Sequence, residues 1–138
     1  CQETPKIKQD EHELSIVVVE DNPQLRRLYE KQFSNWDVTS NVVTAENGFE
    51  GLIAIGNNTP DVIISDLHMP NMDGFQMLEA INKQTQLQRS TIIVVSGLTA
   101  KEIETRGTLP DNAFVFFKPV NFEKLKEFIK SKIKLDEG

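Results

Sequence analysis

Side chains that can do chemistry stand directly after short, largely apolar runs at four places in the chain. Residues 14–19 are followed by Glu20 and Asp21, residues 61–65 by Asp66, residues 91–95 by Ser96, and residues 114–117 by Lys118. Short apolar runs of this kind are typical of strands buried on both faces of a parallel sheet. Ligands of such sheets bind beyond the carboxyl ends of the strands, so we expect the five side chains to meet at one edge.

The three carboxylates predict a magnesium site. Glu20, Asp21 and Asp66 offer the hard oxygen ligands that Mg²⁺ prefers in proteins. Without a cation the clustered carboxylates would repel one another, and at least one would tend to stay protonated. A divalent ion removes that conflict and prepares the site for a dianionic phosphoryl group.

The same group of residues suits phosphoryl transfer. An aspartate carboxylate such as that of Asp66 can act as a nucleophile toward phosphorus and form an acyl phosphate. The transfer depends on positioning and charge neutralisation, for which Lys118 is a natural partner of the phosphate oxygens. Ser96 could donate a hydrogen bond to a further oxygen, and Gly97 beside it leaves space for that group.

Length and composition fit one soluble domain. The 138 residues can bury a core, and 38% hydrophobic with 26% charged residues is ordinary for a globular protein. A net charge of −6 argues against nucleic-acid binding, and the lysines spaced over residues 124–134 indicate a solvated helix face. No apolar stretch has the length of a membrane span. A single cysteine, Cys1, cannot form a disulfide framework and fits a reducing cytoplasm.

Strand and helix signals alternate along most of the chain. Residues 1–12 are polar and are expected to be a flexible lead-in or linker, residues 13–135 to form one domain, and residues 136–138 to be a tail, which an expression vector could have supplied. The alternation predicts right-handed βαβ crossovers and helices on both faces of a parallel sheet. The remaining strand is expected at residues 38–43, and the helices at residues 23–33, 48–55, 75–81, 99–106 and 122–133. Asp21 or Asn22 would cap the first helix and Asn121 the last.

Taken together, these features resemble the receiver domain of two-component response regulators, related to the chemotaxis receivers. The resemblance runs from about Leu14 to Ile133. The motifs that carry it are Glu20-Asp21, residues 61–74, Ser96-Gly97 and Lys118-Pro119. It implies a doubly wound α/β fold of the flavodoxin-like, three-layered kind, with five parallel strands in the order 2-1-3-4-5. The site would lie at the switch between strands one and three.

The resemblance implies a metal site with four protein contributors. Asp66 would be both the phosphoacceptor and a Mg²⁺ ligand, and Asp21 would bind the ion directly. Glu20 would bind it chiefly through water. The backbone carbonyl of His68 would complete the set.

The resemblance also assigns the residues at the ends of the last two strands. Lys118 would contact the phosphate, and Ser96 would be the switch hydroxyl that moves inward on phosphorylation. Pro119 would follow Lys118 through a cis peptide bond. Val115 departs from the family pattern, because an aromatic residue usually stands three positions before the lysine. Whether this chain uses the family's aromatic readout therefore stays open.

The implied activity is that of a signalling phosphoacceptor rather than an enzyme with an external substrate. Such domains catalyse their own phosphorylation from a sensor histidine kinase or a histidine phosphotransfer protein, and usually their own hydrolysis. The composition predicts a cytoplasmic location and no direct binding of nucleic acid or membrane by this segment, and the resemblance implies an output domain that is linked or separate. The surface change could drive dimerisation, docking of a neighbouring domain or release of a partner.

Two other functions remain open from the residues alone. The first is a phosphatase with a nucleophilic aspartate, similar to the haloacid dehalogenase superfamily. Those enzymes carry an Asp-x-Asp pattern, which is absent from both Glu20-Asp21-Asn22 and Asp66-Leu67-His68. The second is a phosphorylation-independent interaction module that keeps the fold but not the switch. Val115 is the feature that favours this second function.

Each candidate residue also has a purely structural explanation. Glu20 or Asp21 could cap a helix, Asp66 could be a turn residue, and Lys118 could be a solvated surface lysine. A serine before a glycine is common in turns, and the lone imidazole of His68 is poor evidence for a metal ligand. Their joint occurrence at strand ends favours the functional interpretation.

Overall fold

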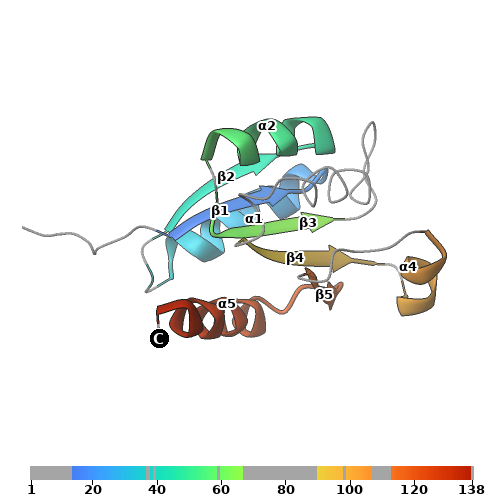
Figure 1. The fold of residues 1–138 in the computed structure, drawn as a ribbon. Coiled ribbons are helices and arrows are strands. Elements are labelled where there is room, and N and C mark those ends of the chain that lie inside the picture. Colours follow the sequence, from blue (N-terminus) through green and yellow to red (C-terminus); the bar gives the residue numbers. More distant parts are fainter. Residues whose placement is uncertain are drawn as a thin grey trace, which may run out of the picture.

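The structure, a computed structural model, describes residues 14–36, 38, 40–58, 60–66, 90–97, 99–106 and 113–137. Strands and helices alternate along these segments (Figure 1). The strands are β1 (Leu14–Val19), β2 (Ser40–Ala45), β3 (Val62–Asp66), β4 (Thr91–Ser96) and β5 (Ala113–Phe117). The helices are α1 (Pro23–Ser34), α2 (Gly48–Asn58), α4 (Ala100–Arg106) and α5 (Phe122–Glu137). The lead-in at residues 1–12 and the helix expected at residues 75–81 lie outside the described residues.

The five strands form one parallel sheet in the order β2-β1-β3-β4-β5. β1 lies between β2 and β3, with Val19 opposite Ala45 of β2 on one side and Ser65 of β3 on the other. The chain moves from β1 to β2 at one edge, then returns past β1 to β3 and continues in that direction to β4 and β5. The predicted doubly wound fold and its strand order are thereby confirmed.

Alternation of side chains along the strands divides the core into two parts. Ile16 and Val18 of β1 face the side that carries α1 and α5, where they pack with Phe33 and Ile129. Val17 and Val19 face the side that carries α2 and α4. Figure 1 shows α2 and α5 on opposite sides of the sheet. Both faces of the central strands are therefore covered, which is why those strands are apolar almost throughout.

The edge strands differ from the expectation that every strand is buried on both faces. The prediction holds for β1, β3 and β4, whose residues are mostly buried. β2 and β5 have a neighbouring strand on one side only, and their side chains are mostly half-buried. On β5, Phe117 is one of the most exposed large apolar residues among those described. An apolar run therefore identified β5 as a strand but did not reveal its edge position.

The limits of three elements also differ from the prediction. β2 starts at Ser40, two residues later than expected, because its register follows β1 from Leu14 onward. α2 passes through Gly56, where a glycine costs about 1 kcal/mol relative to alanine, and ends only at Asn58, before Pro60. α5 continues to Glu137, past residue 135, where the domain was expected to end.

None of the described helices combines the length and the hydrophobicity that a membrane span requires.

Aromatic rings link α1 to α5. Tyr29 and Phe33 of α1 are almost fully buried, and the ring of Tyr29 meets Phe122 edge-on with centroids 5.3 Å apart. Trp36 extends the cluster, with its ring 5.4 Å from that of Phe33. Because Phe122 is the first residue of α5, this contact fixes the helix start just beyond the end of β5.

Replacing Ile129 with alanine should destabilise the protein by about 2–5 kcal/mol, because the side chain is fully buried between α5 and the sheet. The matched control is Ile53→Ala on α2, where the side chain is 64% exposed and the change should stay within about 0.5 kcal/mol. Urea unfolding curves measure both effects. Equal losses for the two variants would contradict this account of the core.

Candidate functional site

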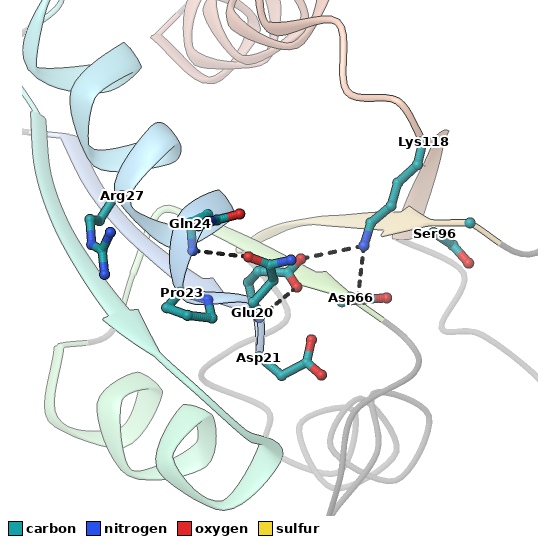
Figure 2. A pocket seen from close by; sticks show the side chains of 10 residues that line it. Glu20, Asp21, Pro23, Gln24, Arg27, Asp66, Ser96 and Lys118 are labelled. Atoms are coloured by element: carbon teal, nitrogen blue, oxygen red, sulfur yellow. Dashed lines mark hydrogen bonds and ion pairs between the residues drawn. The ribbon is translucent and has the colours of Figure 1, made fainter.

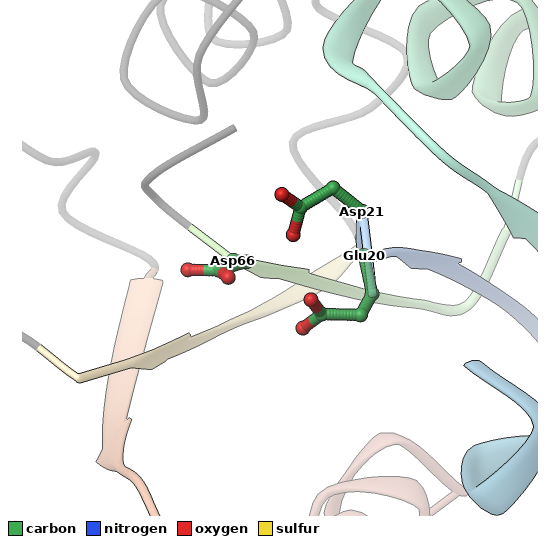
Figure 3. Close-up of side chains that lie close together, drawn as sticks. All are labelled: Glu20, Asp21 and Asp66. Atoms are coloured by element: carbon green, nitrogen blue, oxygen red, sulfur yellow. The ribbon is translucent and has the colours of Figure 1, made fainter. Parts of the chain in front are cut away.

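Glu20, Asp21 and Asp66 meet at the carboxyl ends of β1 and β3 (Figure 3). One carboxylate oxygen from each residue lies within 4.8 Å of the others. Glu20 and Asp66 are only 2% and 6% exposed, whereas Asp21 faces solvent. The cluster lies where the winding direction of the sheet reverses, which is where open parallel sheets bind ligands. The structure therefore brings together the three carboxylates that the sequence analysis singled out.

Asn22, rather than Asp21, caps α1. Its side-chain Oδ1 accepts hydrogen bonds from the backbone N–H of Gln24 at 2.9 Å and of Leu25 at 3.2 Å. Pro23 fills the first helical position, where no N–H is needed. Since the cap is supplied by Asn22, the carboxylate of Asp21 is left to line the cavity at the strand ends.

Lys118 carries a positive charge into the acidic cluster. Pairing between β4 and β5 continues one residue past the end of β5, since the N–H of Lys118 donates to the carbonyl of Ser96 at 2.8 Å. The Lys118–Pro119 peptide is cis, as the family resemblance implied. The ammonium Nζ lies 3.0 Å from Asp66 Oδ2 and 3.6 Å from Glu20 Oε1 (Figure 2). One lysine thus bridges the two buried carboxylates.

The electrostatics of the cluster favour an additional cation. Burial raises the pKa of Glu20 to about 7, the charge of Asp66 adds to the rise, and the N–H of Asn22 and the charge of Lys118 oppose it. Burial by itself lowers the pKa of Lys118, but the hydrogen bond and charge of Asp66, together with Glu20 and Asp21, raise it above its ordinary value overall. The ammonium therefore stays charged at neutral pH, while one of the carboxylates is held close to protonation.

An open cavity of about 720 Å³ gives access to the cluster. Figure 2 shows its wall, which comes from the ends of β1, β3 and β4, from the start of α1 and from the residue after β5. Buried Ser96 and the neighbouring Gly97 line it at the end of β4. Among the described residues, a Cβ built on Gly97 would meet only the Cδ of Lys118, at 4.0 Å, which is an ordinary van der Waals contact.

The other predicted site residues lie at the margin or outside the described part of the chain. Val115 is half-buried and packs with the core on the side of α2 and α4. Pro119 follows Lys118 on the exposed turn before α5. His68, whose carbonyl was expected to complete the metal ligands, lies outside the described residues.

Sequence reasoning overlooked the contribution of α1 to the site. Pro23, Gln24 and Arg27 line the cavity, and the guanidinium Nη1 of Arg26 donates to the carbonyl of Glu20 at 2.7 Å. The first turns of a helix that starts at a strand end necessarily stand beside that end. Helical spacing of polar residues three and four positions apart was the signal that could have revealed this wall.

Comparison with known proteins identifies the family. A model of the response regulator receiver domain matches residues 16–130, which is most of the chain. The chain belongs to that family. Membership agrees with the strand order, the acidic cluster and the lysine described above, and it favours the receiver prediction over the aspartate-dependent phosphatase.

Individual relatives support the same assignment. The receiver domain is 26% identical to protein PilG of Pseudomonas aeruginosa over 127 residues, which cover 92% of this chain and 93% of PilG. It is 27% identical to the sensor histidine kinase CheAY of Helicobacter pylori, covering 97% of this chain but only 17% of that protein. Among solved structures, the chemotaxis protein CheY4 of Vibrio cholerae superimposes with a TM-score of 0.76 at 27% identity, covering 87% of this chain and 98% of CheY4.

Replacing Glu20 with glutamine should stabilise the chelator-treated receiver domain by about 1–3 kcal/mol at pH 8 and change it little at pH 4.5. Folding raises the pKa of Glu20 from 4.5 to about 7, so the folded state holds a proton that the unfolded state has already released. The wild type therefore loses stability relative to the variant as the pH rises through this window. Urea midpoints at a series of pH values measure the difference.

The exposed Glu127→Gln on α5 controls for the exchange of a carboxyl for an amide. A stability difference between Glu20→Gln and the wild type that is the same at pH 4.5 and pH 8 would contradict the electrostatic explanation.

Proposed function

We propose that this receiver domain accepts a phosphoryl group on Asp66 from a phosphohistidine, with Mg²⁺ bound at the acidic cluster, and that it switches a surface in response. The observation that carries the proposal is the convergence of three carboxylates within 4.8 Å beside a lysine ammonium 3.0 Å from Asp66. Phosphoryl transfer depends on positioning and charge neutralisation, and this arrangement supplies both.

The donor set fits a hard divalent cation. Asp21 and Asp66 would bind Mg²⁺ directly, Glu20 would bind it through water, and the carbonyl of His68 would add a further oxygen. Two of the three carboxylates are buried beside each other, an arrangement that a single lysine only partly compensates. When bound, Mg²⁺ would neutralise the negative charge shared by the carboxylates and the phosphoryl oxygens.

In the proposed reaction, a carboxylate oxygen of Asp66 attacks the phosphorus of the donor. The donor reacts with its other ring nitrogen protonated. The P–N bond breaks, its electron pair stays on the nitrogen that carried the phosphoryl group, and the imidazole keeps the proton on its other nitrogen and leaves as a neutral group. The product is an acyl phosphate on Asp66. The open cavity of about 720 Å³ leaves room for the donor side chain to approach.

Lys118 would exchange its contact with the Asp66 carboxylate for one with the phosphoryl group during this reaction. Its ammonium lies against Asp66 Oδ2 in the unphosphorylated protein, and its raised pKa keeps it charged. After transfer the same ammonium would bind a phosphoryl oxygen, so the lysine stabilises both states of the site. The buried hydroxyl of Ser96 would bind another oxygen as the switch group, with Gly97 leaving space beside it.

We further propose that the donor is a sensor histidine kinase or a histidine phosphotransfer protein in the cytoplasm. The match to part of the sensor histidine kinase CheAY supports this class of partner. The output domain would be linked to this domain or separate from it. Val115 would shift when Ser96 moves and would pass that movement on through its aliphatic contacts, in place of the aromatic ring that the family usually has. It packs against the core cluster that includes Ile103 of α4.

Incubation with Mg²⁺ and a small phosphodonor, acetyl phosphate or phosphoramidate, should add the mass of one phosphoryl group to the wild type. Asp66→Asn should show no gain because the nucleophile is absent, and a chelator should abolish the gain in the wild type. Intact-protein mass spectrometry measures the change.

The matched control is Asp61→Asn, which alters another aspartate beside β3, at the opposite end of that strand. It should still be phosphorylated. A folded wild-type protein that gains no phosphoryl group, under conditions that modify a control receiver, would overturn the proposal and favour the phosphorylation-independent interaction module.

Lys118→Met should slow phosphorylation by about 10²- to 10³-fold, because it removes a preorganised cation from the developing charge. Rates follow from quenched time courses at saturating Mg²⁺ and donor. Lys101→Met, at an exposed position of α4, is the control and should react at the wild-type rate. Similar rates for the two lysine variants would rule out the assigned role of Lys118.

A further inference from the structure

The peptide group between Glu20 and Asp21 connects two residues whose carboxylates both belong to the acidic cluster. Consecutive residues of an extended strand point to opposite faces of the sheet. Here both carboxylates turn toward Asp66, and their oxygens come within 4.8 Å of each other and of that residue (Figure 3). The backbone leaves the strand at Glu20, and the orientation of this one peptide group sets how the two carboxylates stand relative to each other.

Arg26 binds the carbonyl of that peptide. The residue lies in the first turns of α1, where its own N–H donates to the carbonyl of Asn22 at 3.0 Å. Its guanidinium Nη1 donates to the carbonyl oxygen of Glu20 at 2.7 Å, which is short for a charge-assisted hydrogen bond. The other terminal nitrogen, Nη2, lies 3.8 Å from Glu46 Oε2 just beyond β2, and the side chain is 19% exposed.

The remaining polar groups of Glu20 are also held. Its N–H donates to the carbonyl of Ala45 at 2.9 Å, and its Oε2 accepts from the N–H of Asn22 at 3.1 Å. The residue is therefore fixed by β2 on one side and by α1 on the other. Arg26 connects these two supports, because the guanidinium spans from α1 across the Glu20 carbonyl to Glu46.

We propose that Arg26 is a positioning residue for the metal site: it holds the Glu20–Asp21 peptide in the orientation that lets both carboxylates face one cation. The inference rests on the proposed function, because it takes Mg²⁺ as the ion bound. It goes further by assigning a role in ion binding to a residue that is outside the acidic cluster and carries a charge of the same sign as the ion.

The sign of the charge makes the proposal testable. By Coulomb's law alone, removing a positive side chain near a cation site should tighten cation binding. Loss of a supporting hydrogen bond should weaken it, typically by about 10- to 100-fold for groups that orient metal ligands. Positioning and simple electrostatics therefore predict opposite changes for the same substitution.

The experiment measures the Kd of Mg²⁺ by isothermal titration calorimetry, without phosphodonor, at pH 8. Arg26→Met should bind Mg²⁺ about tenfold more weakly than the wild type. Arg26→Lys keeps the charge but places all its donors on one nitrogen and lacks the planar fork that spans two acceptors, so its Mg²⁺ affinity should lie between those of the wild type and Arg26→Met. Lys31→Met removes a positive charge from an exposed position of the same helix, on a residue that does not line the cavity, and should not weaken binding.

A second readout separates positioning from a general loss of stability. In phosphorylation assays, the apparent Mg²⁺ constant of Arg26→Met should rise about tenfold, while the maximum rate at saturating Mg²⁺ stays close to that of the wild type. Assays run at temperatures well below the unfolding transition of each variant. Arg26→Lys, which is the milder change, supplies the same comparison if the methionine variant does not fold.

Unchanged or tighter Mg²⁺ binding in both Arg26 variants would overturn the positioning role while leaving the proposed function intact. Equal weakening in Lys31→Met and Arg26→Met would also overturn it, since the carbonyl contact would then be irrelevant. If the wild type itself binds no Mg²⁺, the proposed function fails together with this inference.

Discussion

Burying two carboxylates side by side is the constraint on which this domain depends. Glu20 and Asp66 lie out of water, where repulsion between like charges is much stronger than in solvent. Two features reduce this repulsion: the pKa of Glu20 rises, and Lys118 contacts both carboxylates. An ionic cluster of this kind is weak evidence for stability, because desolvation offsets the attraction. The proposed binding of a cation and then of a phosphoryl group would account for its presence.

The sheet makes that arrangement possible. Glu20, Asp66 and Lys118 are far apart in the sequence, yet each lies at the carboxyl end of a strand or directly after it, and parallel strands end at the same edge. This is why the cluster could be predicted from the chain: the apolar runs located the strands, and the parallel arrangement located their ends. The cap at Asn121 was equally visible, and its Oδ1 accepts from the N–H of Lys124 at 3.1 Å.

Other features depend on contacts that no local pattern encodes. The role proposed for Arg26 rests on its contacts with a carbonyl six residues earlier and with Glu46 on another strand–helix connection. Lys126 looked like part of a solvated helix face, but its Nζ bonds Gln32 Oε1 at 3.1 Å and lies 3.6 Å from Glu123. The limits of β2 follow from its register with β1. Such details are set by tertiary packing, which overrides local propensity at element ends.

The aromatic cluster between α1 and α5 has an optical consequence. The chain contains one tyrosine and one tryptophan, and Tyr29 and Trp36 both belong to the core on the α1 and α5 side. Intrinsic emission and the near-ultraviolet dichroism of these two chromophores therefore report on a single side of the sheet. Local unfolding of α2 or α4 alone would therefore change these signals very little. Local unfolding of α5 would change them directly, because it alters the surroundings of both rings.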